Sequence, residues 1–144
     1  MELETTRFGK LEVDEEEIIT FEDGLYGFED NKRFTLVADE EPFFWLQSMT
    51  DPDLAFVIVE PGVFCQDYEF SLNDKVKDEL QLESKAEVLV MNIVVVPENP
   101  KEMTMNLKAP IIINEKKRIA KQIILEEEEY PVKYRLFEEE SISA

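Results

Sequence analysis

The sequence predicts a mainly β protein, a small antiparallel β-barrel-like domain with one short helix near residues 72–82. Apolar and polar residues alternate in many short runs, which is the period-two pattern of strands. One stretch alone repeats its apolar residues every four positions, as a helix does. Strands do not alternate with long helices, so the pattern argues against a parallel sheet covered by helices. A closed barrel would also leave few exposed edges among so many β-prone runs.

Six short strand-like runs precede the predicted helix. The run from Leu3 turns at Gly9-Lys10 into the run from Leu11 to Val13, so these two runs predict a hairpin. After the third run, Asp23-Gly24 and Gly27 supply the positive-φ positions that a compact loop needs. The four remaining runs are residues 18–21, 34–37, 43–49 and 55–59.

The predicted helix begins near Ser71, which matches a hydroxyl N-cap followed three residues later by the acidic Asp74. Leu72, Val76 and Leu80 recur every four residues and form one apolar stripe. The charged residues between them face water in this pattern. We therefore expect a short helix that packs on the sheet through the stripe.

Four more strand-like segments follow the helix. Residues 87–96 are almost all apolar, which is typical of a central strand buried on both faces. Residues 103–107 alternate, so Met103 and Met105 are predicted to fill the core rather than to bind a soft metal. The last two segments are residues 111–113 and 118–125. The second of these also fits a helix, but the sheet context favours a strand.

Residues 1–137 are predicted to form a single β-barrel domain, because 144 residues fall within the usual size of one domain. The acidic run 126–129, followed by Pro131, is expected to end the ordered core. Residues 138–144 are expected to form an acidic C-terminal tail that frays.

The net charge is −19, and most of it lies in the first half of the chain. Residues 1–72 contain 19 acidic and 4 basic residues, which gives −15. Such a field repels nucleic-acid phosphates and anionic membranes, so no direct nucleic-acid or membrane partner is expected. A basic protein partner fits better, although acidic charge that only keeps the domain soluble explains the same count. The sequence shows no secretory signal or spanning segment, which predicts a cytoplasmic protein.

The sequence lacks the residues that most enzyme mechanisms use. There is no histidine, and Cys65 is the single cysteine, so histidine-based catalysis, disulfides and multi-cysteine metal sites are excluded. Calcium-loop, P-loop and dinucleotide spacings are absent as well, so we expect no metal and no cofactor. A carboxylate pair drawn from Asp51, Asp53, Glu22 and Asp23 remains as a candidate for acid-base work. With 34 acidic residues, neighbouring carboxylates are also expected by chance.

The aromatic run Phe43-Phe44-Trp45-Leu46 is a candidate recognition surface, since aromatic side chains contribute much of the binding energy at interfaces. Alternation sends Phe43 and Trp45 to one face of a strand and Phe44 and Leu46 to the other. One pair is expected inside the barrel. The other pair is either covered or a partner site.

Three segments resemble the FliW family of bacterial flagellar assembly factors: residues 21–29, 41–48 and 106–114, in this order. Their sequences are FEDGLYGFE, EPFFWLQS and NLKAPIIIN. Further similarity lies at Leu54-Ala55-Phe56 and over residues 118–125. The resemblance extends from Leu3 to about Tyr134.

The resemblance implies a small β-barrel-like fold without enzymatic activity. It also implies two cytoplasmic partners, the C-terminal helical region of newly made flagellin and the translational repressor CsrA, which are bound alternatively. Flagellin that accumulates would occupy the factor and free CsrA to silence the flagellin message.

Seven residues are the partner-binding candidates. An apolar strip for an amphipathic flagellin helix is placed at Phe44 and Leu46, with Gln47 beside them. The acidic candidates are Asp23, Glu29, Asp51 and Asp53. Two other hypotheses remain: a carboxylate-dependent hydrolase of a small polar substrate, and an obligate structural subunit of a larger complex.

Overall fold

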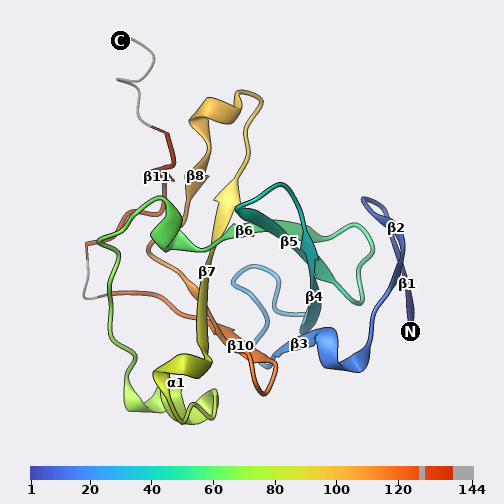
Figure 1. Cartoon of the computed structure of the whole chain (residues 1–144), viewed down its shortest axis with the longest axis horizontal. Helices are drawn as coiled ribbons and strands as arrows, with labels where there is room; N and C mark the ends of the chain where they lie inside the picture. Colours follow the sequence, from blue (N-terminus) through green and yellow to red (C-terminus); the bar gives the residue numbers. More distant parts are fainter. Residues whose placement is uncertain (127–128, 138–144) are drawn as a thin grey trace.

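Seven strands close a barrel in this computed structural model, which describes residues 1–126 and 129–137 (Figure 1). Around the ring the order is β7-β6-β5-β4-β3-β10-β9, and β9 pairs again with β7. The bounds are β3 Ile18–Phe21, β4 Arg33–Ala38, β5 Phe43–Ser48, β6 Ala55–Val59, β7 Val88–Val95, β9 Ile111–Asn114 and β10 Ile119–Gln122. The predicted β-barrel class is therefore confirmed, and the predicted tail at 138–144 lies outside the described residues.

One pair in the ring departs from the antiparallel prediction. β10 runs parallel to β3, with Ile119 opposite Thr20 and Ala120 opposite Phe21, whereas the other neighbours in the ring are antiparallel. The reason is geometric: strand direction cannot alternate around a ring with an odd number of strands. Closure with seven strands requires at least one parallel pair.

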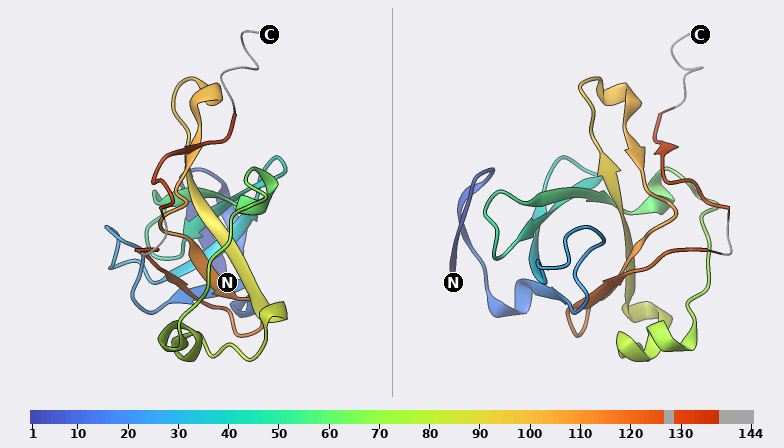
Figure 2. Two further views of the ribbon diagram at one scale, coloured as in Figure 1. Left: turned by 90° about the vertical axis from the view of Figure 1, so that its left-hand side faces the viewer. Right: turned by 180° about the vertical axis from the view of Figure 1, so that it is seen from behind.

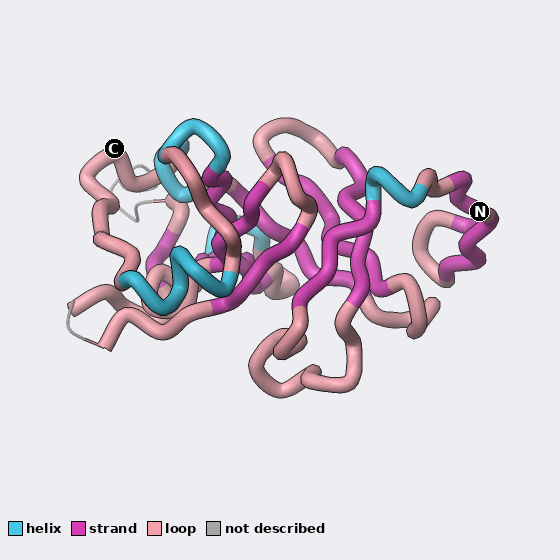
Figure 3. The backbone as a smooth tube through the Cα atoms, turned by 90° about the horizontal axis from the view of Figure 1, so that it is seen from below, coloured by secondary structure: helices cyan, strands magenta, loops and turns pink. Residues whose placement is uncertain are grey.

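Four short strands and the helices lie outside the ring. β1 (Glu2–Thr5) and β2 (Gly9–Glu12) form a separate hairpin, and β8 (Thr104–Met105) and β11 (Tyr134–Arg135) extend from the far end of β7 (Figure 2). The N-terminal hairpin and α1 lie at opposite ends of the molecule (Figure 3). The helical elements are α1 Asp74–Glu79 and the 3₁₀ turns Glu15–Glu17, Pro61–Val63, Lys85–Glu87 and Pro100–Glu102.

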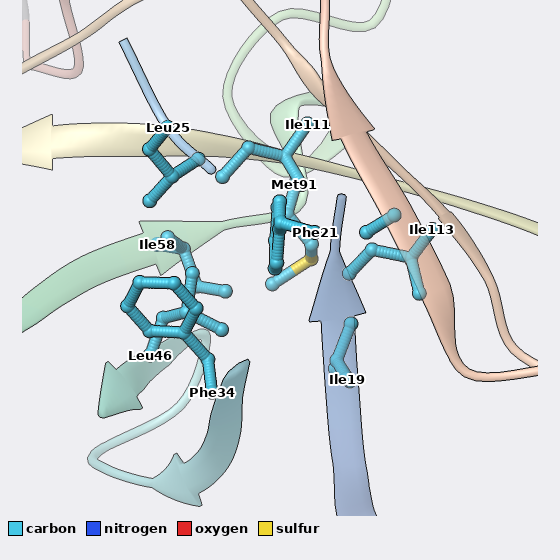
Figure 4. Close-up of a cluster of buried hydrophobic side chains, with 10 residues drawn as sticks. Ile19, Phe21, Leu25, Phe34, Leu46, Ile58, Met91, Ile111 and Ile113 are labelled. Atoms are coloured by element: carbon cyan, nitrogen blue, oxygen red, sulfur yellow. The ribbon is translucent and has the colours of Figure 1, made fainter. Parts of the chain in front are cut away.

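The barrel interior is filled by one cluster of buried apolar side chains (Figure 4). Alternation along β7 sends Met91 into this main core together with the half-buried Leu89, while Val88 and Val90 face outward. The cluster consists of Ile19, Phe21, Leu25, Phe34, Leu46, Ile58, Met91, Ile111, Ile113 and Ala120. Met105 is also buried, in a second cluster beside β8, so the prediction that the methionines fill the core holds for it.

Three local predictions are corrected by the structure. The N-cap of α1 is Asn73, whose side chain accepts a hydrogen bond from the Val76 N–H at 2.9 Å, and not Ser71. Asparagine caps as well as serine, so the sequence offered two starts two residues apart. The N-terminal hairpin turns between Thr5 and Gly9, because the Thr5 hydroxyl accepts from the Phe8 N–H and donates to the Gly9 carbonyl. The ordered core also extends beyond residue 129, since β11 pairs with β8 and Leu136 is buried.

A loop between β3 and β4, residues 22–32, lies over one end of the barrel, inside the ring of strands as seen in Figure 1. We call it the end loop. Leu25 points from it into the main core (Figure 4). The Phe28 N–H donates to the Leu25 carbonyl at 2.8 Å, and the Tyr26 N–H donates to the buried Gln122 Oε1 at 2.9 Å. The loop is thus fixed to the barrel by one apolar anchor and by backbone hydrogen bonds.

Gly24 gives a direct test of how tightly the end loop is held. Its φ is +67°, and a Cβ there would lie 2.7 Å from the Cα and the carbonyl oxygen of Glu29. Gly9 has the same φ with nothing within 4 Å, so Gly9→Ala carries only the cost of a left-handed residue, about 1–2 kcal/mol. Gly24→Ala adds a backbone clash, and we expect it to destabilise by at least about 3 kcal/mol in urea unfolding. Equal losses for the two variants would contradict this description of the loop.

Candidate functional site

An apolar groove lies on the outside of the barrel, between the segment that leads into α1 and the segment that follows it. Its volume is about 790 Å³. The floor is formed by Val88 and Val90 on β7 and by Ile112 on β9. Residues 68–72 form one wall, and residues 82–85 form the other. A second hollow, beside Glu79 and Lys121, is much smaller, with a volume of about 20 Å³.

The floor is apolar because the outer face of the barrel is apolar at this point. Val88 and Val90 face outward on β7, and Val76 and Leu80 of α1 pack on the neighbouring Ile112. The short helix covers only part of this outer face. The uncovered part becomes the floor of the groove, rimmed by charged residues of both signs, Glu69, Lys77, Glu83 and Lys85.

The first wall is held by a tyrosine far along the chain. The Tyr130 hydroxyl accepts from the Glu69 N–H at 3.0 Å and donates to the Glu69 carbonyl at 2.8 Å. The ring of Tyr130 also meets that of Tyr68 edge to face, with centroids 4.6 Å apart. The wall is therefore fixed by a residue that follows it by 61 positions.

The second wall is held by polar groups on both sides of it. The Glu87 carboxylate accepts from the Glu83 N–H at 2.9 Å and from the Ser84 N–H at 3.0 Å. The first of these hydrogen bonds is the largest cause of the lowered pKa of Glu87. Just before the wall, the Asn114 amide donates to the Leu80 carbonyl at 2.8 Å, which fixes the end of α1 to β9.

Lys121 of β10 connects the end loop to α1. Its Nζ lies 2.9 Å from Asp23 Oδ2 and 2.8 Å from Glu79 Oε2. The hydrogen bond to Glu79, followed by the one to Asp23, raises the pKa of Lys121, and the bond from Lys121 lowers the pKa of Asp23. Asp23, one of the acidic candidates, is therefore engaged by a cation of the same chain.

The predicted apolar strip is corrected by the structure. Leu46 and Gln47 are fully buried, and Phe44 is half-buried against the main core. The physical reason is register: Leu46 stands between Leu36 of β4 and Phe56 of β6, and this face of β5 is the inner one. The outward pair is Phe43 and Trp45. The structure therefore does not present the side chains of Leu46 and Gln47 to a partner.

The outward pair of β5 is itself largely covered. Phe43 stacks on Phe64 with ring centroids 6.0 Å apart. Trp45 meets Phe8 edge to face at 5.7 Å, and the Arg7 guanidinium lies 4.5 Å above its ring. The indole N–H donates to Asp39 Oδ2 at 2.9 Å. These contacts attach the N-terminal hairpin to the barrel.

The other acidic candidates are spread over two loops. Asp51 and Asp53 lie in the turn between β5 and β6, where Asp51 Oδ1 accepts from the Asp53 N–H at 2.9 Å and Asp53 accepts from the Thr6 hydroxyl. Glu29 lies in the end loop, and the Gly27 N–H that donates to it is the main cause of its lowered pKa. Of the four carboxylates weighed for acid-base work, Asp23, Asp51 and Asp53 thus have their own structural contacts. Whether any of these acids contacts a partner stays a prediction.

No group of three or more His, Cys, Asp and Glu side chains in residues 1–126 and 129–137 is arranged to hold a metal ion. No helix in the described chain has the length and apolar character needed to cross a membrane.

Comparison with known proteins identifies the family. The family model described as FliW protein matches residues 2–136. The chain belongs to the FliW family. The flagellar assembly factor FliW of Caldicellulosiruptor saccharolyticus is 50% identical over 132 residues, covering 91% of this chain and 87% of that protein. The flagellar assembly factor FliW of Clostridium tetani is 42% identical over 143 residues, covering 98% and 99%.

A solved structure supports both the fold and the family. The crystal structure of the flagellar assembly factor FliW superimposes with a TM-score of 0.92 at 39% identity, covering 96% of this chain and 99% of that one. The resemblance seen in residues 21–29, 41–48 and 106–114 is therefore confirmed. Membership of the FliW family supports a role in flagellar assembly.

The groove was not among the predicted sites, although the sequence carried a signal for it. The prediction that residues 87–96 are buried on both faces implied an apolar outer face, but not what covers it. Phe70 and Leu82, on either side of the helix, are apolar residues outside its stripe, and both line the groove. The half-buried state of Val88 and Val90 follows from the short helix and could not be read from the pattern.

The Lys121 bridge predicts a pH-dependent contribution to stability. Asp23 has a lowered pKa in the folded chain, so its contribution is present above its ordinary value of 3.8 and is lost as the pH falls through the folded value. Because Asp23 is well exposed, we expect Lys121→Met to lose only about 0.5–1 kcal/mol at pH 7. The difference from the wild type should shrink below about pH 4. Urea unfolding at several pH values measures this difference in the free energy of unfolding. The exposed Lys133→Met is the charge-matched control. A loss of stability in Lys121→Met that does not depend on pH would count against the bridge.

Proposed function

We propose that the chain binds newly made flagellin in the cytoplasm and alternatively binds and antagonises CsrA, so that flagellin synthesis follows assembly. Membership of the FliW family is the observation that carries this proposal. Flagellin that accumulates occupies the chain and frees CsrA to silence the flagellin message. Export of flagellin frees the chain to antagonise CsrA again.

The groove is the part of the surface that best suits an amphipathic flagellin helix. A helix that binds in this way lays its apolar face into a groove and leaves its polar face in water. On the floor the half-buried Val88 and Val90 offer apolar contact, and the rim offers charges of both signs to the polar edges of a helix. This proposal replaces Phe44 and Leu46, which face the main core, as the place of the apolar strip.

For CsrA, the charge of the chain is the supporting observation. A protein that binds RNA needs a basic surface. The −15 carried by residues 1–72 attracts such a surface over a distance and speeds association. Once bound, the same carboxylates repel RNA phosphates. Antagonism is in part electrostatic on this proposal.

Variants of two valines on one strand test the groove. Val90 lies on its floor, whereas Val95 is exposed on the same strand and lines no part of the groove. Val90→Lys places a charge where the apolar face of the helix would lie, and we expect it to weaken binding of the flagellin C-terminal region at least about ten-fold. Val95→Lys adds the same charge and should leave the affinity within about two-fold. Isothermal titration measures both, after urea unfolding has shown that each variant is folded.

Equal losses for Val90→Lys and Val95→Lys would move the flagellin site away from the groove. Unchanged binding of Val90→Lys would do the same. In either case the wild-type titration decides separately whether flagellin is bound at all.

The switch itself is tested by competition between the two partners. We expect the purified chain to form a complex with CsrA in size-exclusion chromatography with light scattering, and flagellin to displace CsrA from it. The association rate with CsrA should fall by about ten-fold or more between 0.05 and 0.5 M salt, because ions screen the attraction. A well-folded chain that binds neither protein would refute the proposal.

The salt series separates two readings of a positive result. A complex whose association rate is insensitive to salt would keep CsrA as a partner and remove the electrostatic mechanism. The alternative of an obligate structural subunit predicts that the chain alone is unstable, which the unfolding measurements also test. Asp23 does not support the hydrolase alternative, because Lys121 lowers the pKa of its carboxylate, whereas a catalytic acid needs a raised pKa.

A further inference from the structure

The end loop exposes two aromatic side chains that the chain itself covers only in part. Tyr26 is 55% exposed and Phe28 is 41% exposed. Both belong to the tight turn that the Phe28 N–H closes on the Leu25 carbonyl. Exposed aromatic side chains of this size are enriched at binding surfaces, because they give large contact area with few rotatable bonds.

The same loop is surrounded by negative charge. Residues 22–32 contain four exposed carboxylates, Glu22, Asp23, Glu29 and Asp30, and one basic residue, the exposed Lys32. Lys121 pairs with Asp23. Within the described residues, no ion pair is formed by the other three. Glu29 accepts a hydrogen bond from the Gly27 N–H, and all three carboxylates are exposed on the same loop as the two aromatic side chains, where they can meet a cation from outside.

The loop is also held in place before any partner arrives. Leu25 anchors it in the main core, and Gly24 has no room for a Cβ against Glu29. Phe28 is braced by the ring of Phe56, edge to face with centroids 5.1 Å apart. A surface that is already ordered loses little entropy on binding, so even a small contact area can give useful affinity.

The N-terminal hairpin contains an example of an arginine bound next to an aromatic ring and a carboxylate. There the Arg7 guanidinium lies over the ring of Trp45, whose N–H donates to the Asp39 carboxylate. Arginine binds aromatic faces and carboxylates together, because its planar guanidinium stacks and also forms two parallel hydrogen bonds. The end loop offers both kinds of group without an arginine of its own in this role.

We propose that the end loop is a docking site for an arginine-containing basic segment of a protein partner, held by Tyr26 and Phe28 and by the carboxylates of Glu22, Glu29 and Asp30. A nucleic acid or an anionic membrane would be repelled by these carboxylates. Where the basic partner is CsrA, this inference names its contact surface and to that extent rests on the proposed function. The docking chemistry itself needs only an arginine-bearing segment.

Fluorescence anisotropy of the full chain with a labelled hexa-arginine peptide tests the site without any natural partner. The double variant Glu29→Gln with Asp30→Asn removes two charges from the loop. Glu15→Gln with Glu16→Gln removes the same charge from an exposed 3₁₀ turn elsewhere. We expect the loop pair to weaken peptide binding at least about five-fold more than the control pair, because close charges act more strongly than distant ones.

Substitutions of Tyr26 separate stacking from charge. Tyr26→Leu keeps an apolar side chain but loses the aromatic face, and we expect about two- to five-fold weaker binding of hexa-arginine. Tyr26→Phe keeps the face and should bind as the wild type does. A hexa-lysine peptide should bind the wild type more weakly than hexa-arginine, and Tyr26→Leu should narrow that difference. The side chain of Tyr26 is well exposed, so thermal unfolding should show the two variants equally stable.

Several results would overturn the inference. They are absence of peptide binding to the wild type, equal loss in the loop and control pairs, and unchanged binding of Tyr26→Leu. The same variants titrated with CsrA separate this inference from the proposed function. Wild-type binding to CsrA that the loop variants leave intact refutes the loop as the CsrA surface and keeps the proposed function. If the peptide binds through the loop but the wild type does not bind CsrA, the docking site is supported and the proposed binding of CsrA is refuted.

Discussion

Closure of the barrel by the parallel pairing of β3 with β10 is the constraint on which the rest of the structure depends. An odd ring of seven strands cannot close with antiparallel pairs alone, so two strands about a hundred residues apart must meet in the same direction. Their pairing brings Ile19 and Phe21 into one core with Ala120. It also sets Lys121 and Gln122 beside the end loop, where they hold Asp23 and the backbone of Tyr26.

Closure also explains why candidate binding surfaces lie outside the barrel and over its end. Over the described residues, the interior is filled by the apolar side chains of the main core. The outer faces of β7 and β9 are apolar at Val88, Val90 and Ile112, and the six-residue helix buries Ile112 but leaves Val88 and Val90 half-buried. One end of the barrel is closed by a loop that buries Leu25 and therefore turns its other residues outward.

Much of the fold could be predicted from the sequence, because alternation reports directly which runs are strands. The runs at 18–21, 43–49 and 55–59 match β3, β5 and β6 closely. Alternation does not say which of the two faces of a strand points inward. For β5 the sequence prediction therefore placed Leu46 on the outer face, whereas its cross-strand neighbours Leu36 and Phe56 put it on the inner face. The parallel closure and the groove could not be predicted, since both depend on contacts between segments far apart in the chain. The family resemblance implied which partners to expect, but not which residues contact them.

Tyr130 has a consequence for the order in which the protein is made. Its single hydroxyl binds both the N–H and the carbonyl of Glu69, as a neighbouring strand would, and so completes a wall that begins some sixty residues earlier. A polypeptide is synthesised from its N-terminus, so the strands of the barrel leave the ribosome before this tyrosine does. The first wall of the groove therefore gains this pair of hydrogen bonds only after residue 130 has left the ribosome. A copy that ends before this residue would have the floor and both wall segments but not the bonds that hold Glu69 in place.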